Sequence, residues 1–275
     1  MLSEFNYHRP ESLDDAIELI NTTVDGLFLA GGQTILPLMK HNLATPTDII
    51  DLASIEELKG ISVNDESITI GAMTSHTTVA KSQIVRDNFL SLAELAGAIG
   101  DPHIRNKGTI GGSIAYNDPA ADYPAALLGL GATVFTNKRE ISADDFFVDI
   151  FETALEEGEL IIRIDFPFVD CTAYEKFANP ASLFALVGVM VSRNDSIVRV
   201  AVTGAGPSVF RINQIEKALE ASFTAASLDE VPIKHADLNT DLHASAEYRA
   251  HLIKVLAARA VRKAANQLDQ KAPHL

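Results

Sequence analysis

Cysteine is almost absent from this sequence of 275 residues, which contains only Cys171. A single cysteine excludes a disulfide framework within the chain. It also excludes an iron–sulfur cluster held by this chain alone, because such clusters normally take four thiolate ligands. We expect Cys171 to be a small buried hydrophobic residue, which is a commoner role for an isolated cysteine than that of a nucleophile.

Basic clusters and long apolar runs are missing as well. The formal net charge of −15 argues against a nucleic-acid backbone or an anionic membrane surface as a partner. No apolar run approaches the ~18–20 residues of a membrane span. The N-terminus also shows no basic and apolar leader pattern, so we expect a cytoplasmic protein without a membrane span.

Motifs for metal binding and hydrolysis are absent too. The eight histidines show neither a His-Glu-x-x-His motif nor a pairing with cysteine, so the sequence predicts no metal site. Ser113 lacks the Gly-x-Ser-x-Gly context of a serine hydrolase, and no other residue is predicted to be catalytic. His103 has two open interpretations, a contact with a cofactor or substrate and a hydrogen bond that stabilises its loop.

Length and composition fit a soluble globular protein with two domains. Hydrophobic residues make up 47% and charged residues 21% of the chain, and one domain typically has about 100–200 residues. Three strand-like runs precede two helical runs in the C-terminal part: 173–177, 183–193, 196–202, 212–221 and 248–267. This order indicates a separate α+β domain with a three-stranded antiparallel sheet. We therefore predict an α+β (mixed α/β) protein with domains at 1–170 and 171–275.

The first candidate binding loop lies between a strand and a helix. A helical pattern at residues 12–20, opened by a capping box that begins at Ser12, is followed by an apolar run at 27–30, typical of a strand buried on both faces. The loop at 31–34, which begins Gly31-Gly32, comes next, and residues 35–40 are again helical. This order presents main-chain N–H groups to a phosphate.

The second candidate loop lies within residues 98–122, a run of glycines, small residues and Asp-Pro steps that we predict to be irregular. Upstream, Ser91 and Glu94 fit a capping box that would open a helix reaching the start of this run. Adjacent glycines at Gly111-Gly112 let a ligand approach the main chain, and successive N–H groups can surround an anion. An isolated Gly-Gly pair is more often a tight turn. The similar loop at 31–34 favours the binding interpretation, and a diphosphate suits both loops.

A third glycine motif, at residues 204–209, half resembles a dinucleotide-binding fingerprint. Its third glycine is missing, and Pro207 removes an N–H donor where a phosphate would lie. We predict a turn there rather than a binding site.

Taken together, the motifs resemble the FAD-binding medium subunit of molybdenum hydroxylases, the group that includes carbon monoxide dehydrogenase and xanthine dehydrogenase. The segments that carry the resemblance are 30–40, 104–115 and 118–122, with further agreement at 5–10, 203–207 and 244–249. The resemblance implies a two-part FAD-binding domain of the vanillyl-alcohol-oxidase (PCMH) type, divided near residues 55–60. It also implies a C-terminal domain of the CO-dehydrogenase-flavoprotein type.

The resemblance also implies the residues that bind FAD. The two loops would hold the diphosphate from two sides, and Asp122 would accept a hydrogen bond from the ribose or adenosine part. Ile161 and Lys176 match positions at the flavin end. The implied set is Leu29, Ala30, Gly31, Gly32, Gln33, Thr34, Ile99, Thr109, Ile110, Gly111, Gly112, Ser113, Asp122, Ile161 and Lys176. Ser113 stands where the family often has Asn or Asp, and Gln33-Thr34 where it often has His-Ser or Thr-Asp; all of these side chains form hydrogen bonds.

The implied function is electron transfer. FAD on this chain would receive electrons from [2Fe-2S] clusters on a small partner subunit, while a large subunit carries the molybdenum-pterin cofactor, in a heterotrimer that dimerises. The external acceptor would be NAD, oxygen or a quinone. Two alternatives remain open: a free-standing FAD-dependent oxidoreductase of the same fold, and a subunit that has lost FAD and serves as a scaffold.

Overall fold

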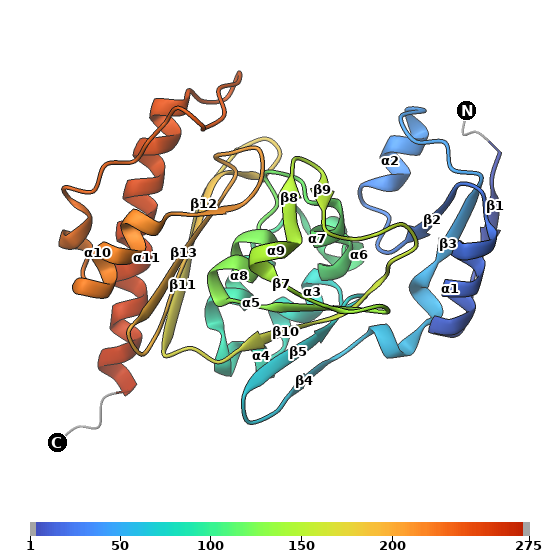
Figure 1. Cartoon of the computed structure of the whole chain (residues 1–275), viewed down its shortest axis with the longest axis horizontal. Helices are drawn as coiled ribbons and strands as arrows, with labels where there is room; N and C mark the ends of the chain where they lie inside the picture. The colour runs from blue at the N-terminus through green and yellow to red at the C-terminus, as the bar shows by residue number, and fades with distance from the viewer. Residues whose placement is uncertain (1–3, 272–275) are drawn as a thin grey trace.

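The computed structural model describes residues 4–271. The molecule is elongated, and its three larger sheets follow one another along the long axis, from the N-terminal end to the long C-terminal helix (Figure 1). Residues 1–3 of the predicted first domain and residues 272–275 of the predicted second domain lie outside the described residues.

The N-terminal unit is a small parallel sheet with a helix packed against it. Its elements are β1 (Asn6–His8), α1 (Leu13–Thr22), β2 (Gly26–Leu29), α2 (Ile35–Lys40) and β3 (Asp48–Asp51), and the strand order is β1-β3-β2. Ser12 caps α1 by accepting a hydrogen bond from the N–H of Asp15, as the sequence predicts. Two 3₁₀ turns, η1 (Leu52–Ser54) and η2 (Glu56–Leu58), then lead to the second sheet.

The middle unit is a mixed layer of one sheet and several short helices. Its five-stranded sheet has the order β4-β5-β10-β6-β7, formed by Ile61–Val63, Ser67–Gly71, Ile161–Pro167, Thr133–Thr136 and Glu140–Ser142. The helices are α3 (His76–Lys81), α4 (Gln83–Asn88), α5 (Leu90–Gly97), α6 (Pro102–Lys107), α7 (Ile110–Tyr116), α8 (Tyr123–Leu130) and α9 (Ala143–Phe146). A two-stranded hairpin, β8 (Phe147–Asp149) and β9 (Glu152–Thr153), projects beside them (Figure 1).

The C-terminal unit is an antiparallel sheet covered by a long helix. The strands β11 (Cys171–Ala178), β12 (Ala185–Asn194), β13 (Ile197–Thr203) and β14 (Phe210–Arg211) pair in sequence order. The remaining elements are α10 (Asn213–Ala221), η3 (Ala225–Leu228) and α11 (Ala246–Lys271), which packs along β11 and β12. The sheet therefore has four strands rather than the predicted three, because a two-residue strand carries no periodic pattern that a sequence could reveal.

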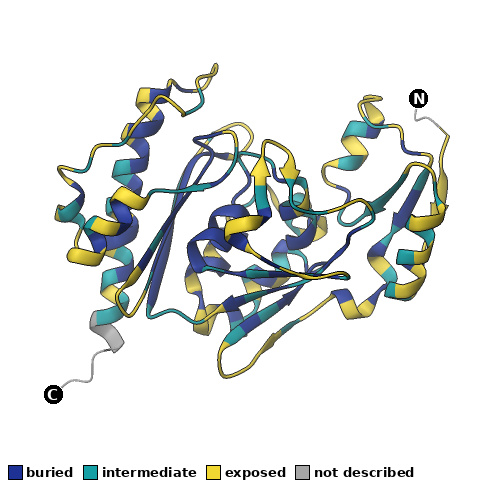
Figure 2. Ribbon diagram, in the orientation of Figure 1, coloured by how far each residue is buried: buried dark blue, intermediate teal, exposed yellow. Residues whose placement is uncertain are grey.

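Helix α8 joins the middle and C-terminal units. It is buried along its whole length and packs against β12 and β13 (Figure 2). Gly129 allows this approach, since a Cβ at that position would lie 2.5 Å from Cγ of Met190. The buried core of the middle unit thus extends into the C-terminal sheet through Met190 and Ala201.

Three local predictions were wrong. Ser91 does not cap a helix: it is a buried residue inside α5, and its hydroxyl lies 3.4 Å from that of Thr172. Residues 98–122 are not an irregular loop, because Asp101 and Thr109 cap two short helices there, α6 and α7. Strand β2 is only half buried rather than covered on both faces, since Leu27 and Phe28 line the cavity described below.

Candidate functional site

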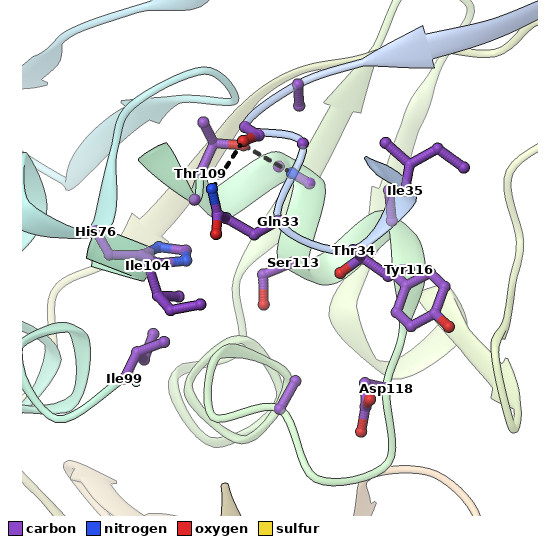
Figure 3. A pocket seen from close by; sticks show the side chains of 18 of the residues that line it. Gln33, Thr34, Ile35, His76, Ile99, Ile104, Thr109, Ser113, Tyr116 and Asp118 are labelled. Carbon is purple, nitrogen blue, oxygen red and sulfur yellow. Dashed lines mark hydrogen bonds between the residues drawn. The ribbon is translucent and has the colours of Figure 1, made fainter. Parts of the chain in front are cut away.

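A cavity of about 690 Å³ lies where the N-terminal sheet meets the helices of the middle unit. This volume is within the range of about 300–1,000 Å³ that is usual for cofactor and small-molecule sites. Figure 3 shows side chains from both sequence-predicted loops pointing into one space, with His76, Ile99 and Ile104 on one side and Tyr116 and Asp118 on another.

The first loop, residues 31–34, supplies main-chain donors. It follows β2 directly, and Gly32 has a φ of +71°, a left-handed conformation that favours glycine. Among the described residues, none accepts a hydrogen bond from the main-chain N–H groups of residues 31–34. All four residues line the cavity. Successive unpaired N–H groups of this kind form a binding site for an anion such as a diphosphate.

The second loop differs from the sequence prediction in its chemistry. Its N–H groups are already used within the protein: those of Ile110 and Gly111 donate to the carbonyls of Thr74 and Ala72, and that of Gly112 to the Thr109 hydroxyl. The N–H of Ser113 donates to the Thr109 carbonyl. This loop therefore faces the cavity with side chains and α-carbons rather than with free N–H donors.

Two glycines of these loops make room for the protein's own main chain. A Cβ on Gly31 would lie 2.1 Å from the carbonyl oxygen of Lys107, and a Cβ on Gly111 would lie 2.6 Å from Cβ of Ala72. Both positions require glycine because main chains from distant segments touch there. At Gly112 the nearest atoms are Oγ1 of Thr109, at 3.0 Å, and Cβ of Ala30, at 3.3 Å.

Asp122 lies at the cavity in a buried cluster with two residues of β11. Its Oδ1 accepts a hydrogen bond of 2.5 Å from the Tyr174 hydroxyl, and its Oδ2 lies 2.8 Å from Nζ of Lys176. Lys176 also donates to the carbonyl of Ala98 at 3.2 Å. Burial raises the pKa of Asp122, and the Lys176 ammonium opposes that shift. Asp122 and Lys176 are thus in contact, whereas the resemblance placed them at different ends of the cofactor.

Most of the implied FAD-binding residues lie together on the cavity wall. Those that line it are Ala30, Gly31, Gly32, Gln33, Thr34, Ile99, Thr109, Gly111, Gly112, Ser113, Asp122 and Ile161. Leu29, Ile110 and Lys176 do not line it: Leu29 ends β2, Ile110 is fully buried in the core, and Lys176 lies behind Asp122.

His76 is a cavity residue that no sequence motif revealed. It is 4% exposed, and neither ring nitrogen forms a hydrogen bond with a described residue. Burial, together with the nearby Arg105 charge, lowers the pKa of His76 to about 4, so the ring is neutral at pH 7. Its only sequence signal is its place shortly after residues 67–71, which form β5. By contrast His103, which the sequence singled out, does not line the cavity.

Two acidic residues also line the cavity. Burial raises the pKa of Asp118, which accepts a hydrogen bond from the N–H of Ala120. Glu159 is fully enclosed; burial opposes its ionisation, but hydrogen bonds from Arg139, from the Glu156 N–H and from Thr136 lower its pKa to about 2. Neither carboxylate was predicted to line the site. Glu159 lies among other acidic residues in the sequence, and the sequence around Asp118 is typical of a turn.

The loop between β11 and β12 completes the wall. Residues 181–184 line the cavity, although they belong to the C-terminal unit. The sequence analysis assigned residues 183 and 184 to a strand, but β12 begins at Ala185 and Leu183 has a φ of +63°. Their apolar character resembles that of the strand that follows, and this is why the pattern was misleading.

The fold and the cavity suit a protein that binds a cofactor with an anionic group between a small N-terminal sheet and a helical layer. Residues 3–169 match the model of the FAD binding domain in molybdopterin dehydrogenase, and residues 172–264 match that of the CO dehydrogenase flavoprotein C-terminal domain. The chain belongs to this family of FAD-binding molybdopterin dehydrogenase subunits. The sequence-based resemblance is therefore confirmed, and so are the α+β fold class, FAD as the cofactor and the oxidoreductase class.

Named relatives match over nearly the full length. The nicotine 6-hydroxylase medium subunit of Paenarthrobacter nicotinovorans is 34% identical, with 94% of this chain and 97% of the relative covered. The carbon monoxide dehydrogenase medium chain of Hydrogenophaga pseudoflava is also 34% identical, with 94% and 96% covered.

Solved structures agree with these matches. Carbon monoxide dehydrogenase from Hydrogenophaga pseudoflava superimposes with a TM-score of 0.88 at 33% identity and covers 97% of this chain and 99% of the matched chain. Quinoline 2-oxidoreductase from Pseudomonas putida 86 gives a TM-score of 0.88 at 26% identity, with 98% and 99% covered.

Residues 4–271 contain neither a membrane-spanning helix nor a metal-binding cluster of side chains. No helix in that range is long and apolar enough to cross a membrane. No group of three or more His, Cys, Asp or Glu side chains in the same range is arranged to hold a metal ion.

Proposed function

We propose that this chain is the FAD-carrying subunit of a cytoplasmic molybdenum hydroxylase. It receives electrons from [2Fe-2S] clusters on a small partner subunit and passes them through FAD to an external acceptor, which is NAD, oxygen or a quinone. A large subunit carries the molybdenum-pterin cofactor, and the three chains form a heterotrimer that dimerises. The observation that supports this most directly is the cavity with the unpaired N–H groups of residues 31–34.

The residues of the cavity fit the parts of FAD. The N–H groups of residues 31–34 suit the diphosphate, and the Ser113 hydroxyl faces the same space from the opposite loop (Figure 3). The Asp122 carboxylate offers acceptors to sugar or ribityl hydroxyls. The apolar side chains of Ile99 and Ile161 suit flat aromatic rings.

FAD supplies the redox chemistry when bound, and the protein supplies position and electrostatics. With one cysteine, this chain has no thiolate set for an iron–sulfur cluster. The electrons must then come from another subunit. In support, named relatives are medium chains or medium subunits, such as the glyceraldehyde dehydrogenase medium chain of Sulfolobus acidocaldarius, which is 30% identical over 95% of this chain.

The same proposal assigns the domains. Residues 1–170 form the FAD-binding domain, with its two parts divided near 55–60, and residues 171–275 form the C-terminal domain. In support, the division falls in the 3₁₀ turns between two sheets, and the boundary falls between the end of β10 at Pro167 and the start of β11 at Cys171. Asp122 and Lys176 meet across this boundary, so FAD binding requires both domains.

Purification alone and with its partners tests the function. We expect the full-length chain to show a flavin absorption spectrum after incubation with FAD, and to be reduced rapidly only when the iron–sulfur subunit is present and reduced. A chain that cannot be loaded with FAD would be a scaffold. Rapid turnover of an organic substrate by the isolated flavoprotein would instead identify a free-standing oxidoreductase, and either result would contradict the proposal.

A further inference from the structure

Tyr174 reaches the cavity only through Asp122. Its side chain is 6% exposed and lies on β11, two residues before Lys176. Residues two apart on a strand point to the same face, and both side chains contact the carboxylate of Asp122. Glu175, between them, points the other way and lies 3.7 Å from Lys263 of α11.

The hydroxyl of Tyr174 occupies a space that the neighbouring strand leaves open for it. Gly188 lies on β12, opposite Lys176 in the register. A Cβ on Gly188 would lie 2.2 Å from the Tyr174 hydroxyl oxygen, so any other residue would displace that hydroxyl. Glycine at this position therefore keeps the Tyr174 hydroxyl within reach of Asp122.

The main chain around Asp122 is held independently of Tyr174. The carbonyl of Pro119 accepts hydrogen bonds from the N–H of Gly204 and from the Thr203 hydroxyl, at 2.8 and 3.1 Å. The same Thr203 proton is shared with the carbonyl of Ala121, whose oxygen lies 2.6 Å from the hydroxyl oxygen. Loss of the Tyr174 hydroxyl thus frees the carboxylate to rotate but leaves the segment that carries it in place.

These contacts leave part of the carboxylate available. Each oxygen of Asp122 accepts one hydrogen bond from β11, whereas a carboxylate has about four acceptor positions. Asp122 lines the cavity. Because Tyr174 and Lys176 fix the plane of its carboxylate, they also fix the direction in which the remaining acceptor positions point. A hydrogen bond from a hydroxyl to a charged acceptor is stronger than one between neutral groups, so it can hold the carboxylate in one orientation.

We propose that Tyr174 is a positioning residue of the FAD site: its hydroxyl holds Oδ1 of Asp122, while Lys176 holds Oδ2, so that the carboxylate accepts hydrogen bonds from hydroxyl groups of the cofactor. This inference rests on the proposed function, because it concerns the same FAD site. It makes the C-terminal domain responsible for the orientation of a binding residue that belongs to the FAD-binding domain.

The test compares two buried tyrosines of the same core. Tyr174→Phe removes the hydroxyl that holds Asp122, whereas Tyr123→Phe removes a buried hydroxyl that has no hydrogen-bond partner among the described residues. We expect Tyr174→Phe to weaken FAD binding by about tenfold or more, measured by quenching of flavin fluorescence, while a cooperative melting transition shows that the variant still folds. Tyr123→Phe should bind FAD like the wild type.

Asp122→Ala and the double variant then identify the route of the effect. If Tyr174 acts through Asp122, Tyr174→Phe adds little once Asp122→Ala is present. Titrations with FMN and with ADP, which represent the two halves of FAD, add a second readout. If Asp122→Ala lowers the affinity for one of them, Tyr174→Phe must lower the affinity for the same one and leave the affinity for the other unchanged.

Four results would overturn the inference while FAD binding by the wild type still stands. Three of them are equal FAD affinities for Tyr174→Phe and Tyr123→Phe, full additivity of the change in binding free energy with that of Asp122→Ala, and an equal loss of affinity for FMN and for ADP. An Asp122→Ala variant with wild-type FAD affinity would overturn it as well. Failure of the wild-type chain to bind FAD at all would instead refute the proposed function.

Discussion

The α-carbon of Gly31 lies directly against the main chain of Lys107, so that a Cβ on Gly31 would come within 2.1 Å of the Lys107 carbonyl oxygen. The two candidate binding loops, about 75 residues apart in the sequence, therefore touch each other at this glycine. The contact fixes how close the two loops can lie at this point.

Gly31→Ala should separate the two loops. We expect it to lower the free energy of unfolding by about 1–3 kcal/mol, as overpacking usually does, and to reduce FAD occupancy. Chemical denaturation and the ratio of flavin to protein absorbance measure the two effects. Gly97→Ala is the matched control, because its Cβ would lie 3.7 Å from Cβ of Ala80, an ordinary contact. If both variants behave alike, close packing is not why Gly31 is a glycine.

Gly112→Val should abolish retention of FAD. The added side chain lies on the cavity wall and crowds Oγ1 of Thr109, which caps α7. The ratio of flavin to protein after gel filtration measures the loss, and Gly112→Ala should lose less because it adds one methyl group. Unchanged flavin content in Gly112→Val would refute the role of this loop in the site.

His76 should make stability depend on mild acid. Its pKa is lowered to about 4 in the folded protein, from 6.5 when unfolded. The unfolded chain therefore binds the proton first, and the stability present above pH 6.5 is lost as the pH falls towards 4, by about 3 kcal/mol in total. Denaturation at several pH values should show this slope in the wild type and in His103→Gln, but less of it in His76→Gln. Equal slopes in all three proteins would contradict the assignment.

Glu159 should stabilise the turn that leads into β10. Its carboxylate joins Arg139, Thr136 and the N–H of Glu156, and its pKa is lowered to about 2. We expect Glu159→Gln to cost about 2 kcal/mol of stability at pH 7. The difference should shrink as the pH falls from about 5 towards 2, where the wild-type carboxylate gains its proton.

Glu156→Gln is the control for this prediction. The Glu156 side chain is 59% exposed and pairs with Lys138 at 3.2 Å, and exposed pairs of this kind contribute about 1 kcal/mol or less. If Glu156→Gln lowers the free energy of unfolding as much as Glu159→Gln does, burial of Glu159 is not the cause of the stabilisation. Urea denaturation of both variants at pH 7 and pH 3 makes the comparison.

Local patterns allowed much of the fold to be predicted. The cap at Ser12 and the strand before residues 31–34 follow from spacing and capping alone. The same rules were wrong at Ser91, where a serine and a glutamate three residues apart lie within a helix. Residue types that cap helices also occur at many positions that are not caps. Only its burial distinguishes Ser91 from a true cap, since it contacts Thr172 of the C-terminal domain.

The sequence by itself determined that two glycine-containing segments flank one site and that the chain belongs to a flavoprotein family. Glycines and motif spacing are sufficient for this because they are properties of the sequence alone. Tertiary structure decided what each part does. The N–H groups of residues 110–113 donate to Ala72, Thr74 and Thr109, whereas those of residues 31–34 have no acceptor among residues 4–271. Asp122 acquires its partners only when β11, more than fifty residues later, packs against it. Hydrogen-bond partners that distant cannot be assigned from local patterns, since they depend on how the two domains pack together.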